Sequence, residues 1–303
     1  MSTMSTSNSE PDSAAGGMPV WAEPLGSDVL ARQRARTSDP NGSARQRAGL
    51  VTATRLLVAR QLRATLRQPI WLVSGLMTPL LYLALFSPLL KGLVGAMAGT
   101  PGYAGGSVID GFMPGLLVLF AFGTGMGAGW IVIGELNAGV IERFRVSPIP
   151  RIAILLGTTI KDAIMFVIPA VIVVCVAAIF GFTIHIGGLA LAFVLLVLLT
   201  AAISAFSATV GLKMKVVGSL AAVITSLQLP LTLLSGILLP MSLGPKWLNV
   251  VAHVNPMYYA TEAARYLCSG QFNGTVWLGF GVVAGVLILV LVWGNRVYGK
   301  AVA

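Results

Sequence analysis

Six apolar segments recur along the chain between residues 70 and 293, separated by polar or glycine-rich connections. Each is close to the roughly 20 residues that a helix needs to cross the hydrocarbon of a bilayer. We therefore predict an all-α polytopic membrane protein with six transmembrane helices. The predicted spans are Ile70–Leu90, Phe112–Gly134, Ala163–Phe182, Leu189–Leu212, Val216–Leu239 and Thr275–Trp293.

The polar pattern before the first span has two parts. Residues 1–48 are rich in Ser, Pro, Gly and charge and hold no apolar run, which predicts a disordered tail without a signal peptide, retained in the cytosol. Residues 49–69 are predicted to form an amphipathic helix in the membrane interface, or alternatively a helix packed on the protein. Its apolar positions at helical spacing are Leu56, Ala59, Leu62 and Leu66. Residues 70–303 then form the transmembrane domain.

Composition and the placement of charge agree with this architecture. Charged residues make up 10% of the chain and apolar residues 56%, whereas a soluble domain carries about 25% charged residues. With the N-terminus inside, 17 of the 20 Lys and Arg residues fall on the inner side of the six spans. This is the bias that orients membrane proteins, so both termini are predicted to be cytosolic. The net charge of +10 is therefore explained by the orientation of the chain in the membrane and gives no reason to expect nucleic acid.

The sequence lacks the constellations that an enzyme would need. His185 and His253 have no second ligand at metal-binding spacing, so no metal site is predicted. No G-x-x-x-x-G-K-[ST] sequence is present, so the chain has no nucleotide-binding loop of its own. Lys161 and Asp162 are placed at the edge of the third span, which leaves the middles of all six spans uncharged. That pattern argues against a proton-coupled carrier and against an intramembrane hydrolase.

Small and polar residues mark two of the spans. The second span contains two overlapping G-x-x-x-G spacings, Gly123/Gly127 and Gly125/Gly129, which allow close approach of another helix. They indicate either packing within the subunit or a surface lining a subunit interface or a pathway. The fifth span carries five polar residues, which we call the polar thread. Their pattern fits either helix–helix hydrogen bonding or contact with the substrate. Its members are Thr225, Ser226, Gln228, Thr232 and Ser235.

The most charged stretch beyond residue 92 is ERFRVSPIPR, Glu142–Arg151. Glu135–Phe144 is predicted to continue the second span as a polar helix with an apolar ridge. Pro148 and Pro150 disfavour helical geometry at the residues before them, so this helix should stop near Val146 and restart around Arg151. The result would be a rigid projection, charged on some sides and apolar on another. This combination favours docking of a soluble partner over a solvated loop.

Two blocks of the sequence resemble the ABC-2 type transporter permeases. The first is E-x-x-x-G-V-I-E-R-F-R-V-S-P-I-P-R, beginning at Glu135, and the second is LLSGILLPM, Leu233–Met241, with the following Pro245–Arg265. The resemblance covers roughly residues 50–300. Within the family, LRQPIWLVSGLMTPLLYLALFSPLL and ERFRVSPIPR are most similar to daunorubicin-resistance-type drug and lipid exporters.

This resemblance implies a coupling helix that docks on an ATP-hydrolysing subunit. The residues that would form or support it are Glu135, Gly139, Glu142, Arg143, Arg145, Ser147, Pro148 and Arg151. It also implies an external re-entrant helix that closes the outer end of the path. The residues carried over to that helix are Asn255, Pro256, Tyr258, Glu262 and Arg265.

The resemblance further implies a working complex of two permease subunits with two ATPase subunits. The second permease would be another copy of this chain or a sister permease. This chain would hold no cofactor, and ATP and Mg²⁺ would lie on the partner ATPase. The expected function is export of a hydrophobic or amphipathic compound across the cytoplasmic membrane of a bacterium. Export of a lipid-linked glycan or polysaccharide is the alternative, and a membrane-embedded lipid-modifying enzyme is an alternative from another class.

Overall fold

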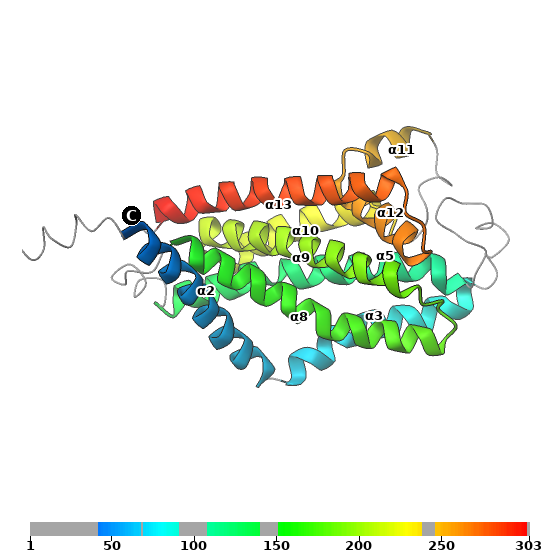
Figure 1. The fold of residues 1–303 in the computed structure, drawn as a ribbon, viewed down its shortest axis with the longest axis horizontal. Coiled ribbons are helices and arrows are strands. Elements are labelled where there is room, and N and C mark those ends of the chain that lie inside the picture. The colour runs from blue at the N-terminus through cyan, green and yellow to red at the C-terminus, as the bar shows by residue number, and fades with distance from the viewer. Residues whose placement is uncertain (1–41, 68, 91–107, 140–150, 238–245, 302–303) are drawn as a thin grey trace, which may run out of the picture. The chain divides into compact units, whose positions relative to one another are not determined.

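The structure is a computed structural model, and it describes residues 42–67, 69–90, 108–139, 151–237 and 246–301 (Figure 1). All regular secondary structure in these ranges is helical, which confirms the predicted all-α polytopic class. The chain divides into two units, residues 1–48 and 49–303, and the packing described below is that of the second. The helices are α2 (Gly42–Leu66), α3 (Pro69–Leu90), α5 (Val108–Met126), α6 (Ala128–Asn137), α8 (Arg151–Ile179), α9 (Ile186–Met214), α10 (Val217–Leu233), α11 (Lys246–Ala252), α12 (Pro256–Cys268) and α13 (Gly274–Ala301).

The described residues hold four helical stretches that are long and apolar enough to cross a membrane and two shorter apolar helices. The long stretches are Ile109–Asn137, Ile152–Ile179, Ile186–Met214 and Gly274–Gly299, and the shorter ones are Gly75–Leu85 and Val217–Leu233. Each of the six corresponds to a predicted span. The second span is built from α5 and α6 in series, and the third lies in α8, where the apolar stretch begins at Ile152 rather than at Ala163.

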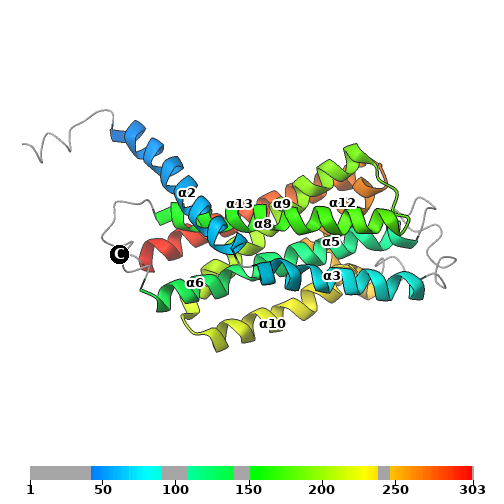
Figure 2. The ribbon, with the colours of Figure 1, turned by 90° about the horizontal axis from the view of Figure 1, so that it is seen from below.

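Helix α9 lies at the centre of the bundle. It packs against α5, α6, α8, α10, α12 and α13, and Leu195, Leu196 and Ala205 on it are fully buried. The positions of the neighbouring helices therefore depend on the α9 side chains against which they pack. Figure 2 shows α3 and α10 on the side of the bundle away from α13.

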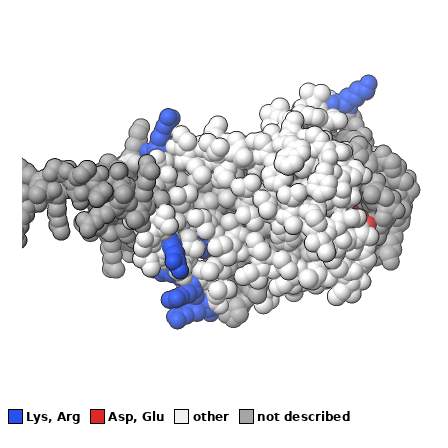
Figure 3. All heavy atoms as spheres, viewed as in Figure 1, with Lys and Arg blue, Asp and Glu red and all other residues white. Residues whose placement is uncertain are grey.

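The two ends of the bundle differ in charge. The end of α6, the start of α8, the α9–α10 turn and the C-terminus lie at one end, and α11 and α12 lie at the other (Figure 1). This is the alternation that six crossings require. Most of the Lys and Arg side chains visible in Figure 3 lie near the first end. Which end faces the cytosol stays a prediction from the charge bias.

Helix α2 differs from its prediction in two respects. It begins at Gly42 rather than at the predicted Gly49. Its contact with the bundle is made by buried Thr54 and by Leu57, whose Cβ lies 3.2 Å from the position of a Cβ built on Gly157. Leu56 and Leu66, predicted on the apolar side, are exposed. The residues facing the bundle are thus offset from the predicted row, and placement in the membrane interface stays a prediction.

Candidate transport groove and docking element

A half-open cavity of about 390 Å³ lies between α3, α5, α8 and α10. Its lining is mostly apolar, with hydroxyl and amide groups from Thr78, Tyr82, Thr124 and Gln228. None of the described lining residues is charged. The complete lining consists of Gly75, Thr78, Pro79, Tyr82, Leu116, Leu119, Phe120, Gly123, Thr124, Gly127, Pro169 and Gln228. We call this cavity the α3–α5 groove.

The two glycine pairs of the second span lie in different surroundings. Gly123 and Gly127 line the α3–α5 groove, and a Cβ built on Gly123 meets nothing within 4 Å. Gly125 and Gly129 instead press against α9, because a Cβ built on Gly125 would lie 2.8 Å from Ile203 Cβ and one on Gly129 would lie 2.7 Å from the carbonyl oxygen of Ser207. One pair is therefore used for packing and the other leaves space.

The polar thread of α10 is divided in the same way. Thr225, Ser226 and Gln228 are exposed on the subunit, and Gln228 is the one that reaches the α3–α5 groove. Ser235 is buried and donates to the carbonyl oxygen of Thr232 at 2.6 Å. Ser235 thus serves the local helix end, and Thr232 is half-buried beside it. The exposed side chains of Thr225, Ser226 and Gln228 are available to a substrate or to a second subunit.

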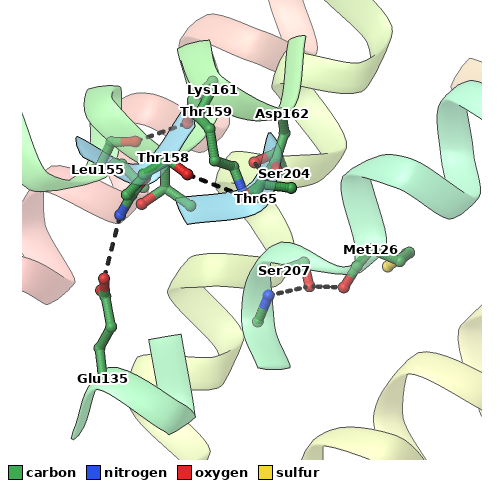
Figure 4. A network of polar contacts seen from close by, with 12 residues as sticks. Thr65, Met126, Glu135, Leu155, Thr158, Thr159, Lys161, Asp162, Ser204 and Ser207 are labelled. Atoms are coloured by element: carbon green, nitrogen blue, oxygen red, sulfur yellow. Dashed lines mark hydrogen bonds and ion pairs between the residues drawn. The ribbon is translucent and has the colours of Figure 1, made fainter. Parts of the chain in front are cut away.

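A break between α5 and α6 lies at Gly127, beside the groove. Ser207 of α9 bridges it: its hydroxyl donates to the carbonyl oxygen of Met126 at 2.6 Å and accepts from the N–H of Gly129 at 3.0 Å (Figure 4). The break exposes backbone groups that need partners, and Ser207 supplies both. Sequence reasoning missed this residue. The available signal was the spacing of Thr200, Ser204 and Ser207 along one side of an apolar helix.

Lys161 and Asp162 lie inside α8 and within the candidate span Ile152–Ile179, so the prediction that they flank the third span is wrong. Both side chains are buried, with 2.6 Å between Lys161 Nζ and Asp162 Oδ1 (Figure 4). Ser204 of α9 donates to Asp162 Oδ2 at 2.6 Å. Buried charges are tolerated only when paired and hydrogen-bonded, and this pair meets both conditions. The apolar run beginning at Ala163 concealed the fact that the helix extends well before it.

The docking element lies for the most part outside the described residues. The structure ends α6 at Asn137, and Gly139 adopts a left-handed conformation with φ of 67°. The prediction that this helix continues to Phe144 is therefore wrong, because that backbone conformation terminates a helix. The predicted restart is confirmed, since α8 begins at Arg151. Glu142, Arg143, Arg145, Ser147 and Pro148 lie outside the described residues.

Glu135, predicted to support the docking element, contacts α2. The side-chain amide of Gln61 donates to Glu135 Oε1 at 3.2 Å. Helix α2 is thereby attached to the end of α6, immediately before the segment predicted to dock.

Helix α12 is fixed by polar contacts to the end of α10. Asn255 caps it by accepting from the N–H of Met257 at 3.0 Å, and its amide donates to the carbonyl oxygen of Leu231 at 2.7 Å. Pro256 is the first helical residue, as the pattern predicted.

The Glu262–Arg265 pair secures the same helix further along. Arg265 is buried, lies 3.0 Å from Glu262 and donates to the carbonyl oxygen of Gly236. Burial raises the pKa of Glu262, while the Arg265 guanidinium acts in the opposite direction. The rings of Tyr258 and His253 pack against each other at a tilt of 45°, with centroids 4.8 Å apart. The five residues predicted for a re-entrant helix therefore lie in or directly before one helix that is packed against the spans.

The fold is that of a polytopic helical membrane protein whose groove offers apolar and neutral polar contacts. Comparison with known proteins identifies its family: the profile described as ABC-2 type transporter matches residues 52–268. The chain belongs to the ABC-2 type transporter family and is a membrane subunit of an ABC transporter.

Relatives with assigned names agree with this membership. A putative transport permease ycf38 from Cyanophora paradoxa is 29% identical over 216 residues, covering 71% of this chain and 73% of that protein. The daunorubicin resistance ABC transporter permease protein DrrB1 of Streptomyces coeruleorubidus is 25% identical over 237 residues, covering 78% and 81%. The transport permease ycf38 of Porphyra purpurea is 26% identical over 216 residues, covering 70% and 72%.

Proposed function

We propose that this chain is the permease of an exporter that moves a hydrophobic or amphipathic compound, a drug or a lipid, out across the bacterial cytoplasmic membrane. Transport is driven by a separate ATPase subunit, which holds ATP and Mg²⁺. Two permease subunits complete the path. Both termini of this chain lie in the cytosol, as the distribution of Lys and Arg favours.

The observation that carries the proposal is the α3–α5 groove. Its walls are apolar with a few neutral polar groups, which suits a substrate that partitions into the membrane and is oriented by one or two hydrogen bonds. It is half-open on the isolated subunit, so a second permease would complete it. The exposed Thr225 on α10, three residues before Gln228, adds a polar group to the same side.

Filling the groove tests this assignment. Gly123→Leu places a side chain in the open space that the structure leaves at that position. Gly281→Leu on α13 is the matched control, because a Cβ built there also meets nothing within 4 Å but the residue is not part of the groove. In the complex with the ATPase, Gly123→Leu should abolish stimulation of ATP hydrolysis by daunorubicin or phospholipid and retain basal hydrolysis. Equal stimulation of ATP hydrolysis in both variants would show that the groove is not part of the transport path.

Charge reversal tests the docking element. Glu142→Arg combined with Arg145→Glu alters the segment between α6 and α8. Arg296→Glu, the control, changes an exposed charge on α13, outside that segment. We expect the first variant to lose co-purification with the ATPase and the coupling of hydrolysis to transport. If both persist, the docking role is wrong.

The buried Lys161–Asp162 pair makes an ion-gradient control necessary. Transport in vesicles should continue when the proton gradient is collapsed and should stop when ATP is omitted. The opposite result would identify a secondary carrier. Turnover of a lipid by this chain alone, without ATP or partner, would identify the enzyme alternative.

A further inference from the structure

A second cavity, of about 160 Å³, lies between α10 and α13, with α9 along one wall. It is half-open, and residues of α5 and of the start of α12 complete its walls. Every described residue that lines it is apolar, whereas the α3–α5 groove carries hydroxyl and amide groups. The two cavities share no described lining residue. We call the second cavity the α10–α13 slot.

The slot is elongated along the helices that form it. Its lining extends from Leu199 to Phe206 on α9 and from Val283 to Val290 on α13, which is about 10 Å on each helix at the rise of an α-helix. Met257, in the first turn of α12, lines the slot toward the end of the bundle where α12 lies (Figure 1). Because α9 and α13 are both candidate spans, the slot runs in the same direction as the acyl chains of a surrounding bilayer.

The surroundings of the slot indicate where its occupant comes from. Helix α10 packs on α9 and α6, and α13 packs on α8, α9 and α12, so the slot fills the space that these two helices leave between them. Leu229 of α10 and Ile288 and Leu289 of α13 are exposed on the same stretches, as expected for surfaces that meet lipid. The half-open slot is therefore reached from the hydrocarbon of the membrane.

The lining decides which part of a lipid can enter. An apolar cavity of about 150 Å³ stays free of water and takes up small apolar ligands, and the slot has a similar volume. A phospholipid headgroup would find no hydrogen-bond partner among the described lining residues. Met126 and Met257 contribute flexible, polarizable side chains that adapt to the shape of a bent hydrocarbon chain.

We propose that the α10–α13 slot binds one acyl chain of a membrane phospholipid as a resident ligand. The proposal adds a binding site to the subunit and does not depend on the identity of the exported compound.

A chain bound in the slot would support α10 beside the α3–α5 groove. Leu227 and Leu231 of α10 line the slot, whereas Gln228 reaches the groove. Pro230 lies inside the same helix and removes one of its backbone hydrogen bonds, so this stretch depends on side-chain packing for its position. The bound acyl chain thereby holds the side of α10 that carries Gln228 against the groove.

Retention of phospholipid during purification tests the binding. Ala202→Leu on α9 extends a side chain into the slot, and Val286→Phe narrows the slot from α13 if the first variant fails to fold. Ala190→Leu on the same helix as Ala202 is the matched control, because Ala190 lines a separate apolar groove between α8 and α9. The full chain is purified in a mild detergent, delipidated stepwise and analysed by native mass spectrometry.

The native chain and Ala190→Leu should keep one phospholipid per subunit, and its occupancy should fall at least tenfold in Ala202→Leu and in Val286→Phe. Phosphatidylethanolamine and phosphatidylglycerol with the same acyl chains should replace one another equally. Equal retention in all four proteins, or no retention in the native chain, would overturn the proposal. A strict preference for one headgroup would also overturn it, by assigning the lipid to a polar site elsewhere. Displacement of the retained lipid by daunorubicin would assign the slot to the exported compound instead.

Amide hydrogen exchange tests the support of α10. Adding phosphatidylglycerol back to the delipidated native chain should slow exchange over residues 217–233 several-fold. The same addition should leave exchange in Ala202→Leu unchanged. Equal slowing in the two proteins would show that a lipid in the slot does not hold α10.

Discussion

Substituting alanine for Gly125 adds one methyl group where α5 meets α9. Its Cβ would lie 2.8 Å from Ile203 Cβ and 2.9 Å from the carbonyl oxygen of Thr200, whereas ordinary contacts begin at 3.4 Å. The carbonyl oxygen belongs to the backbone of a central, buried helix and cannot rotate away. The two helices must therefore separate by about half an ångström, or the substituted helix must shift along its axis.

The same substitution at Gly123 supplies the reference. Gly123 lies on α5 two residues away, and a Cβ built there meets nothing within 4 Å. Both substitutions gain up to about 1 kcal/mol from the higher helix propensity of alanine. Only Gly125→Ala incurs the overpacking penalty of about 1–3 kcal/mol. The free energies of unfolding of the two variants should therefore differ by this penalty, with Gly123→Ala the more stable.

Thermal unfolding in a mild detergent measures this difference. For a chain of this size each kcal/mol corresponds to a shift in Tm of about 2–4 °C, so the two variants should be separated by several degrees. Equal Tm values, or a higher Tm for Gly125→Ala, would refute the assignment of Gly125 to the α5–α9 contact.

Three further substitutions test other contacts of the bundle by the same unfolding measurement. Lys161→Met leaves Asp162 buried without its cation and should lower the free energy of unfolding by about 3–5 kcal/mol. The double variant Lys161→Met with Asp162→Leu should recover most of this stability. Failure to recover it would mean that the pair is not the relevant contact. Ser207→Ala leaves the N–H of Gly129 without its acceptor and should cost about 1–3 kcal/mol, so an unchanged Tm would contradict the bridge across the α5–α6 break. Asn255→Asp retains the cap of α12 but loses the donor to Leu231, whereas Asn255→Ala loses both. The alanine variant should be the less stable by about 0.5–2 kcal/mol, and equal Tm values would show that the cap contributes nothing.

Several features could be predicted from sequence because their cause is local. The length of an apolar run sets whether a helix can cross a bilayer, and each predicted span corresponds to an apolar helical stretch of the described residues, four of them long enough to cross. The sequence Asn255–Pro256 marks a helix start through an amide cap and a fixed φ, and α12 begins there. The restart at Arg151 follows from the two prolines before it.

Other features depend on which surface a residue meets. Both G-x-x-x-G pairs satisfy the same spacing rule, yet only Gly125/Gly129 faces a helix. The apolar run that began at Ala163 placed Lys161 and Asp162 at its edge, although Ser204 on α9 makes their burial within α8 tolerable. The left-handed Gly139, which lies just past the end of α6 and cuts short the predicted polar extension of the second span, is compatible in sequence with a continuing helix.

The sequence by itself thus determined the membrane location, the number of apolar helices and the end of the bundle at which positive charge accumulates. Each of these follows from the transfer of a segment between water and lipid, a property of that segment alone. The tertiary structure decided which glycines pack, which line the α3–α5 groove, and where a buried charge pair is stabilised. Each of those features depends on a contact with a residue from a distant part of the chain. The periodicity of one segment describes that segment alone and does not identify the residue that it contacts.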